Sequence, residues 1–149
     1  MYDSRMDTVE HINTVRRFMA RVQDKLVHRM IAHDYSKLVT PEKEIFDEFT
    51  PKLKSSTYGS DEYKSFLEAM KPALDNHYKF NSHHPEHFEN GIKEMTLLDI
   101  IEMLVDWKAA TLRHADGDIF KSIEINQKRF GYSDELKSIF LNTAKELDF

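Results

Sequence analysis

The stretch TLLDIIEMLVDWKAATLRH, residues 96–114, decides the fold expected for this chain. Its apolar residues occur on every side of a helix, and a helix of that kind is typically buried in a helical core. Three carboxylates interrupt the apolar surface, namely Asp99, Glu102 and Asp106. At about 100° per residue they fall within roughly 60° of one another on one face. We therefore predict a buried helix that carries a stripe of carboxylates.

The three carboxylates of this helix need partners, because burying an unpaired carboxylate is costly. Asp99 stands three residues after Thr96, at the spacing of a capping box, so it could serve only to start the helix. Glu102 could pair with a structural arginine or lysine. Asp106 is too far from the helix start to cap it and has no lysine or arginine four residues away. Asp106 is therefore the best candidate for a metal ligand among them.

Helical periodicity extends over most of the chain, and strand-like alternation is hard to find. Apolar residues recur at steps of three and four over about residues 7–32, which marks one face of a long helix. A short helix is expected over residues 40–49, with Thr40 as N-cap and Pro41 at the first helical position. Another is expected from Ser60 to about residue 81, and Pro72 should kink or divide it. Two more are expected, one over about residues 118–130 up to Gly131 and one from Ser133 nearly to the end. We predict an all-α bundle of about six helices, forming one domain over residues 1–149.

Composition excludes several classes of protein. Hydrophobic residues make up 40% of the chain and charged residues 32%, which is ordinary for a folded protein and outside the disordered range. No stretch approaches the roughly 20 apolar residues of a membrane span. The absence of cysteine excludes disulfides and thiol ligands, and it fits a cytoplasmic location. The net charge of −5, with scattered lysines and arginines, argues against a partner of duplex DNA.

Histidines provide a second signal, in the stretch HYKFNSHHPEH, residues 77–87. Four of the eight histidines in the chain lie in this stretch. Neutral imidazole and carboxylate suit manganese, iron, zinc, cobalt or nickel. The stretch could also be a solvated loop, but it directly precedes the helix that carries Asp106. This proximity favours a shared metal pocket.

The pair His33–Asp34, in the stretch IAHDYSKL (residues 31–38), is the third signal. A histidine at a helix C-terminus is favoured by the helix dipole, and an aspartate often starts a turn, so the pair could be purely structural. The later histidines and the buried Asp106 shift the balance towards a metal site.

Taken together, these motifs resemble the HD-domain superfamily of metal-dependent phosphohydrolases. His33–Asp34 matches the defining His-Asp pair of that superfamily, and Asp106 is similar to its distal aspartate. The stretch HHPE, residues 83–86, resembles the HHE element of the cyclic-dinucleotide phosphodiesterase branch, although the GYP element of that branch is absent. HDYSKL, HHPEH and DWKAATLRHADGD also resemble a small uncharacterised family of bacteria and phages, which supplies no activity. The superfamily resemblance implies a helical fold and a bound divalent metal.

The resemblance also suggests His11 as a ligand, since HD domains usually have another histidine in the preceding helix. The segment from His11 to His33 contains no turn signal, and one straight helix would separate the two residues by roughly 33 Å. Either the helix breaks, or His11 is a surface residue. We favour the second interpretation, in which the metal ligands are His33, Asp34, His83, His84 and Asp106.

The expected activity is hydrolysis of a nucleotide or another small phosphoester. A divalent metal would activate water and polarise the phosphoryl oxygen. Lys37 is expected to act in catalysis and to bind the substrate phosphate, and Arg113 and Asn81 are further candidates for substrate contacts. Glu86 is the candidate for moving a proton of the attacking water, with His87 as an alternative. The competing hypothesis is a non-catalytic binding or interaction module built on an HD-like scaffold.

Overall fold

The computed structural model describes residues 2–56, 60–113 and 117–149, and no strand occurs in these ranges. The prediction of an all-α protein is therefore confirmed. The chain divides into two compact units, Met1–His33 and Asp34–Phe149, here called the N-terminal and C-terminal units. Because the two units are distinct in this way, the expectation of one domain over residues 1–149 stays a prediction.

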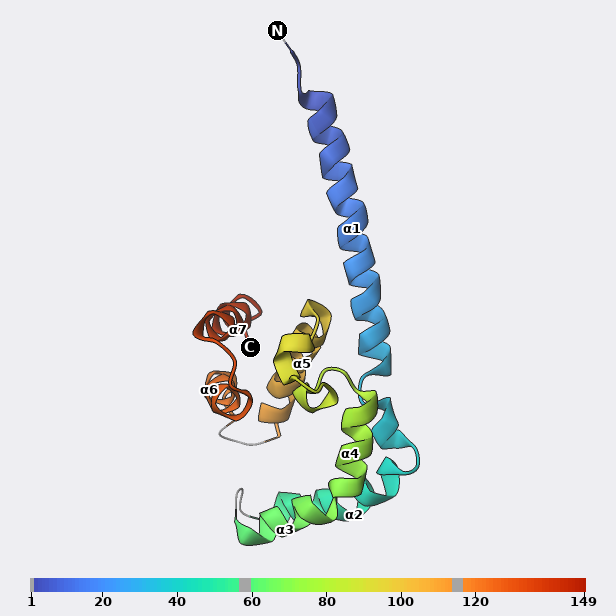
Figure 1. The fold of residues 1–149 in the computed structure, drawn as a ribbon, viewed down its shortest axis with the longest axis vertical. Coiled ribbons are helices and arrows are strands. Elements are labelled where there is room, and N and C mark those ends of the chain that lie inside the picture. The colour runs from blue at the N-terminus through green and yellow to red at the C-terminus, as the bar shows by residue number, and fades with distance from the viewer. Residues whose placement is uncertain (1, 57–59, 114–116) are drawn as a thin grey trace. The chain divides into compact units, whose positions relative to one another are not determined.

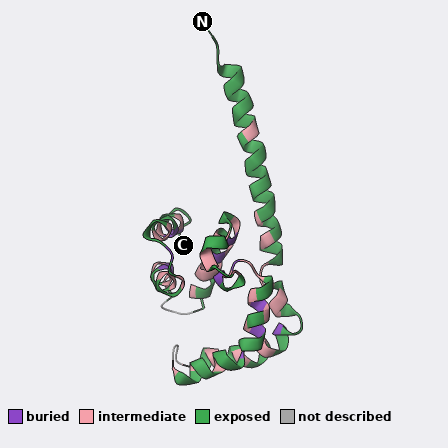
Figure 2. Cartoon of the chain, viewed as in Figure 1, coloured by how far each residue is buried: buried purple, intermediate pink, exposed green. Residues whose placement is uncertain are grey.

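The N-terminal unit is a single long helix, α1 (Arg5–Ala32) (Figure 1). It continues without a break past His11, as its apolar periodicity predicted. Its residues are almost all exposed (Figure 2), and none is buried. His33 follows α1 as its C-cap, and its backbone N–H donates to the Arg29 carbonyl at 2.8 Å. An unbroken helix keeps His11 and His33 roughly 33 Å apart, so they cannot bind one metal ion together.

The described residues of the C-terminal unit form six α-helices and three short 3-10 helices, and the α-helices are labelled in Figure 1. They are η1 (Tyr35–Leu38), α2 (Glu42–Ser55), α3 (Asp61–Ala69), α4 (Lys71–Phe80), η2 (Pro85–His87), η3 (Gly91–Glu94), α5 (Leu97–Thr111), α6 (Ile119–Phe130) and α7 (Asp134–Glu146). The expected third helix is divided at Met70 into α3 and α4, and Pro72 lies in the first turn of α4. With α1, the described residues thus form seven α-helices instead of about six.

Most helix ends follow the predicted signals. The side chains of Ser60, Thr96 and Ser133 accept hydrogen bonds from backbone N–H groups of the helices that they precede. Gly131 ends α6 with a φ of 65°, a left-handed conformation that favours glycine. The predicted cap at Thr40 is wrong, because α2 begins only at Glu42, with Pro41 at the N-cap position. The Thr40 hydroxyl instead donates to the carboxylate of Glu44.

The main hydrophobic core lies among α5, α6 and α7. Its buried residues are Met103, Leu104, Ile119, Ile123, Tyr132, Phe140 and Ala144. The expectation that α5 is buried on every side is only partly correct, because Leu97, Ile101 and Val105 are exposed. The side of α5 that faces α6 contributes Met103 and Leu104 to the core, and its opposite side does not.

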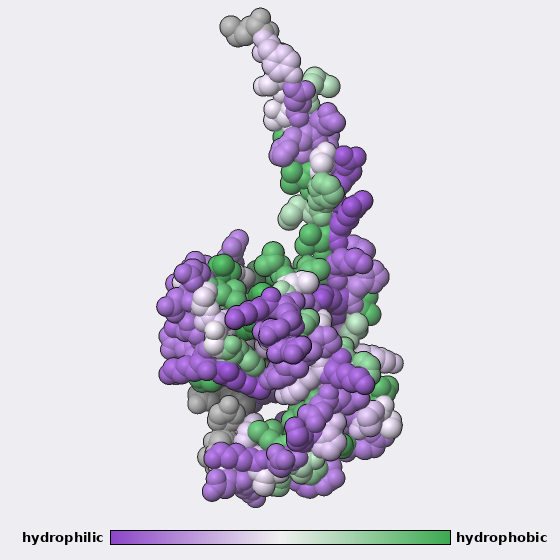
Figure 3. Space-filling model, viewed as in Figure 1, coloured by the Kyte–Doolittle hydropathy of each residue, from purple (hydrophilic) through white to green (hydrophobic). Residues whose placement is uncertain are grey.

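A second packed region holds the site described below. Here α2 packs against α3, α4 and η1, and α4 packs against η1 and η2. Hydrophilic side chains cover most of the visible face of the C-terminal unit (Figure 3). None of the described helices has the length and apolar character needed to cross a membrane.

Candidate metal centre

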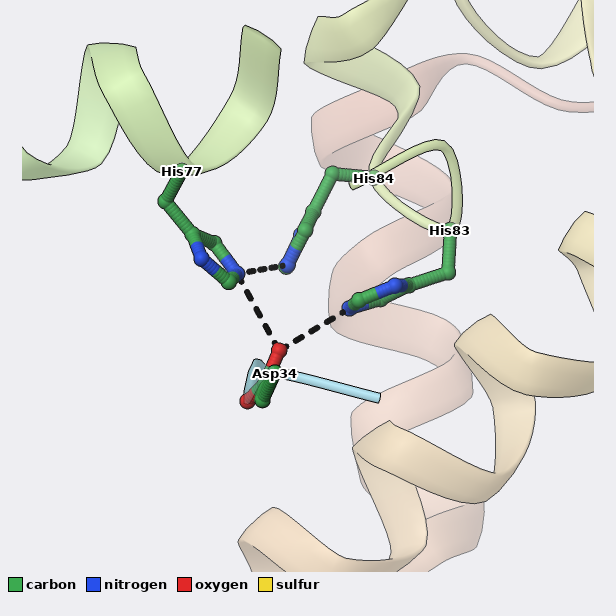
Figure 4. Close-up of side chains that lie close together, drawn as sticks. All are labelled: Asp34, His77, His83 and His84. Carbon is green, nitrogen blue, oxygen red and sulfur yellow. Dashed lines mark hydrogen bonds and ion pairs between the residues drawn. The ribbon is translucent and has the colours of Figure 1, made fainter. Parts of the chain in front are cut away.

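Four side chains of the C-terminal unit converge on one point (Figure 4). Asp34 directly precedes η1, His77 lies in α4, and His83 and His84 lie in the turn between α4 and η2. One donor atom from each residue lies within 4.8 Å of the donor atoms of the other three. We call these four residues the His/Asp cluster.

The donor atoms of the cluster have the spacing of metal ligands. The Nε2 atoms of His77 and His83 lie 3.2 and 3.4 Å from Oδ1 of Asp34. The Nε2 atoms of His77 and His84 lie 3.0 Å apart. Nitrogen and oxygen ligands bound tetrahedrally at about 2.0–2.2 Å from a zinc ion are separated by about 3.3–3.6 Å. The residues present therefore fit a divalent ion at this point.

The position of Asp34 is set by a left-handed turn, with φ of 55° and ψ of 13°. Aspartate tolerates this conformation better than most residues. The ammonium group of Lys37 lies 2.6 Å from Oδ2 of Asp34, which leaves Oδ1 to face His77 and His83. Burial alone would raise the pKa of Asp34, but hydrogen bonds with the two histidines and the charge of Lys37 hold that pKa well below its usual value. Asp34 is therefore ionised, which is the form in which a carboxylate can bind a metal ion.

His84 is neutral in this environment. Burial lowers its pKa far below the ordinary value, and the neighbouring His83, His77 and Lys37 lower it further, against the opposing charge of Asp106. A neutral imidazole has a free nitrogen lone pair, which is the form that binds a metal.

His77 is held from behind by α2. Its Nδ1 atom lies 3.0 Å from Oε2 of Glu42, and Glu42 and His77 are only 0% and 1% exposed. Ser36 donates to the same Glu42 oxygen at 2.9 Å, and Asn76 donates to Oε1 at 2.8 Å. The carboxylate of Glu42 therefore has three polar contacts although it is fully buried.

His83 has a similar arrangement on the side of α5. Its Nδ1 atom lies 3.1 Å from Oε1 of Glu102. Glu102 thus contacts a histidine, and the suggested arginine or lysine partner stays a prediction. With Nδ1 facing a carboxylate, both His77 and His83 direct Nε2 towards Asp34. A carboxylate behind a metal-binding histidine is a recurrent feature of metal sites, because it sets the ring orientation and raises the basicity of the ligand.

The predicted ligands divide into three groups. Asp34, His83 and His84 come together as expected, and their role as ligands stays a prediction. Asp106 faces the same region, since one of its carboxylate oxygens lies within 4.8 Å of one of Asp34. His33 belongs to the N-terminal unit as the C-cap of α1, and its role as a ligand also stays a prediction.

His77 is the member of the cluster that the predicted ligand set omitted. It belongs to the histidine-rich stretch, but it lies six residues before His83 and inside a helix. The position of His77 in the sequence could have identified it, because residues near the end of a helix and residues in the turn that follows readily face the same pocket. Glu42 had no such signal, since its contact with His77 spans 35 residues.

Two of the predicted catalytic and substrate-binding residues lie at the cluster. Lys37 forms the ion pair with Asp34 described above. The amide nitrogen of Asn81 donates to the His77 carbonyl at 2.8 Å and to the Ser36 hydroxyl at 3.0 Å. These bonds give Asn81 a structural task, and a contact between Asn81 and substrate stays a prediction.

The remaining predicted residues have other surroundings. Glu86 forms an ion pair with Arg129 at 2.7 Å, which joins η2 to α6. The alternative residue His87 is exposed, and its Nδ1 atom lies 2.8 Å from the Tyr78 carbonyl. Arg113 is exposed just beyond α5. None of these contacts reaches the His/Asp cluster, so the proposed roles of Glu86 and Arg113 stay predictions.

Asp99 completes the start of α5, as one of the two sequence interpretations expected. Its carboxylate accepts from the backbone N–H and the hydroxyl of Thr96, and the Thr96 hydroxyl accepts from the Asp99 N–H. Ser82 also donates to Asp99. The same carboxylate therefore caps α5 and anchors the turn that carries His83.

Comparisons with known proteins give a family but no activity. No curated protein and no solved structure matches the chain. One family model matches residues 1–147, nearly the whole sequence. The chain therefore belongs to DUF5662, a family of unknown function.

Proposed function

We propose that the chain is a metal-dependent phosphohydrolase that acts on a nucleotide or another small phosphoester. The observation that carries this proposal is the convergence of Asp34, His77, His83 and His84, two of whose imidazoles are backed by carboxylates. The resemblance of His33–Asp34 and Asp106 to HD-domain motifs supports the same chemistry. The lack of cysteine fits a cytoplasmic location for such an enzyme.

The donor set favours a transition metal. Three imidazole nitrogens and one carboxylate oxygen suit zinc, iron, manganese, cobalt or nickel, whereas magnesium and calcium prefer sites made of oxygen. The ion when bound would polarise the phosphoryl group and lower the pKa of a water molecule. His77, His83, His84 and Asp34 would hold the ion, and Asp106, with a carboxylate oxygen within 4.8 Å of one of Asp34, is the proposed further ligand.

The surrounding side chains supply charge for the substrate. Lys37 has the ammonium group in contact with the cluster, and its side chain is 28% exposed. It can therefore reach both Asp34 and a phosphate bound beside it. A fixed cation at this position would stabilise negative charge that develops on the phosphoryl oxygens. Glu86 is the proposed residue for moving the proton of the attacking water, held in place by Arg129.

Elemental analysis and phosphate release test this proposal. Purified wild-type protein should contain about one transition-metal ion or more per chain and should release phosphate from one or more members of a nucleotide panel. Asp34→Asn should lose both properties. Asp47→Asn is the matched control, because Asp47 is an exposed residue of α2 that pairs with Lys43. Metal-free protein that is unaffected by added metal would support the non-catalytic binding module instead.

A further inference from the structure

Two carboxylates lie behind the histidines of the cluster, and the proposed chemistry does not use them. We infer that Glu42 and Glu102 are positioning residues, which hold His77 and His83 with both Nε2 atoms directed at Asp34. This inference rests on the proposed metal site for its effect on affinity. The orientation of the two imidazole rings does not depend on a bound metal.

The hydrogen bonds around His77 indicate that its Nδ1 atom carries a proton. The two N–H groups of the Asn81 amide donate to the His77 carbonyl and to Ser36. The single hydroxyl proton of Ser36 goes to Oε2 of Glu42. Ser36 and Asn81 also lie 3.1 Å from Nδ1 of His77, but their protons are used in these bonds. The His77 Nδ1–H is then the donor that completes the surroundings of Glu42.

An unprotonated Nδ1 on His77 is unfavourable. If Nδ1 of His77 accepted the Ser36 proton, Oε2 of Glu42 would lose both of its donors. Glu42 is 0% exposed, so water cannot replace them. A buried carboxylate oxygen without donors carries a large desolvation penalty. The Nδ1 proton therefore stays between His77 and Glu42.

A proton on Nδ1 determines what Nε2 can do. The Nε2 atom of His77 faces Oδ1 of Asp34 and Nε2 of His84, which are both acceptors when Asp34 is ionised and His84 is neutral. Acceptor atoms that face one another in this way need a hydrogen-bond donor or a cation between them, and a metal ion can bind all of them at once. Glu102 imposes the same orientation on His83 from α5. The carboxylates thus orient two of the proposed ligands, one from α2 and one from α5, before any metal arrives.

Nitrogen-15 NMR of the histidine side chains tests the orientation directly. Wild-type protein, both metal-free and loaded with Zn²⁺, should carry a proton on Nδ1 of His77 and of His83. Glu42→Gln should move the His77 Nδ1–H signal and speed its exchange, while the His83 signal stays nearly unchanged. An unprotonated Nδ1 on His77 in wild-type protein would overturn the inference, and this measurement needs no variant to fold.

Zinc affinity provides the second readout. Glu42→Gln should weaken Zn²⁺ binding by about 10–100-fold in a competition titration, with the same number of ions bound at saturation. The control is Glu48→Gln, the same substitution at an exposed position of α2 that pairs with Lys52. Unchanged affinity in a folded Glu42→Gln protein would contradict the inference.

The two proposals fail in different ways. If wild-type protein binds Zn²⁺ and shows both Nδ1 protons but hydrolyses no phosphoester, only the proposed function is lost. If wild-type protein binds no metal at all, the Nδ1 protons of the metal-free protein still decide whether Glu42 and Glu102 orient the rings.

Discussion

Ser82 donates a hydrogen bond of 2.5 Å to Oδ1 of Asp99, and this contact joins the histidine turn to the start of α5. Ser82 is the neighbour of His83, and Asp99 also closes the capping box with Thr96. The residue that starts the helix therefore also positions a ligand of the candidate metal centre. Stability and metal binding should depend on it together.

Asp99→Ala is predicted to lower the free energy of unfolding by about 1–3 kcal/mol, because it removes a helix cap and the acceptor of the hydrogen bonds from Ser82 and Thr96. Chemical denaturation monitored by circular dichroism would measure the loss. The control is Asp61→Ala, an acidic residue in the first turn of α3 whose side chain is fully exposed. This control should change stability by less than about 0.5 kcal/mol. Equal effects from the two substitutions would show that Asp99 has no special role.

His77→Gln is predicted to reduce the metal content of the purified protein sharply, because His77 contributes one of four donor atoms. His87→Gln is the matched control, since His87 belongs to the same stretch but is exposed, and its side chain contacts the Tyr78 carbonyl and the Phe88 ring. Metal analysis after dialysis against trace metal would compare the two. Full occupancy in His77→Gln would exclude His77 as a ligand.

Local signals in the sequence predicted much of the fold. The spacing of apolar residues predicted α1 without a break, and the Thr96–Asp99 capping box predicted the start of α5. Pro72 correctly indicated an interruption of the third helix. Each of these features depends on residues within one or two helical turns. At Thr40 the same kind of signal was wrong, because its hydroxyl bonds to Glu44 and the helix starts later.

Contacts over long sequence distances account for what the sequence could not predict. Residue types and motifs identified Asp34, His83 and His84, which structure then brings together. The pairing of His77 with Glu42 depends on how α2 packs against α4, and the periodicity of either helix carries no information about it. The sequence could not predict the exposed side of α5 for a similar reason, because the hydrophobicity of a helix does not show how many neighbouring helices cover it.

Chelation should destabilise metal-loaded protein. A ligand that binds only the folded state adds about 2.7 kcal/mol of stability at 100 times its Kd. Excess EDTA should therefore lower the thermal midpoint of wild-type protein loaded with Zn²⁺. Asp34→Asn protein should show no such shift, because it lacks the anionic donor of the cluster. Equal midpoints for wild-type protein with and without EDTA would argue against a structural contribution of metal.

Alkaline pH should destabilise the main core through Tyr132. This side chain is 7% exposed, and its hydroxyl donates to the Ile123 carbonyl. Burial raises the pKa of Tyr132 above the value of about 10 for a tyrosine in the unfolded chain. Folding therefore favours the protonated phenol, and the resulting stability is complete below about pH 10 and is lost as the pH rises towards the folded-state pKa.

The free energy of unfolding of Tyr132→Phe should accordingly fall less with rising alkaline pH than that of wild-type protein. At neutral pH it should be less stable by about 0.5–1.5 kcal/mol, the usual contribution of one hydrogen bond. Denaturant titrations at a series of pH values would give both numbers. Tyr35→Phe, at an exposed position, should follow the wild-type curve. Parallel curves for Tyr132→Phe and wild-type protein would contradict the assignment.

Lys37→Ala separates substrate binding from metal binding. Lys37 contacts Asp34 through Oδ2, whereas the histidines of the cluster face Oδ1, so metal should remain bound in the variant. Loss of a fixed positive charge beside the phosphoryl group should lower kcat/KM for phosphate release by roughly 10²–10³-fold. Lys43→Ala, which removes an exposed lysine from α2, should leave the rate unchanged. An unchanged rate in metal-loaded Lys37→Ala would exclude Lys37 from catalysis, and loss of metal instead would show that its charge is needed to hold Asp34 in place.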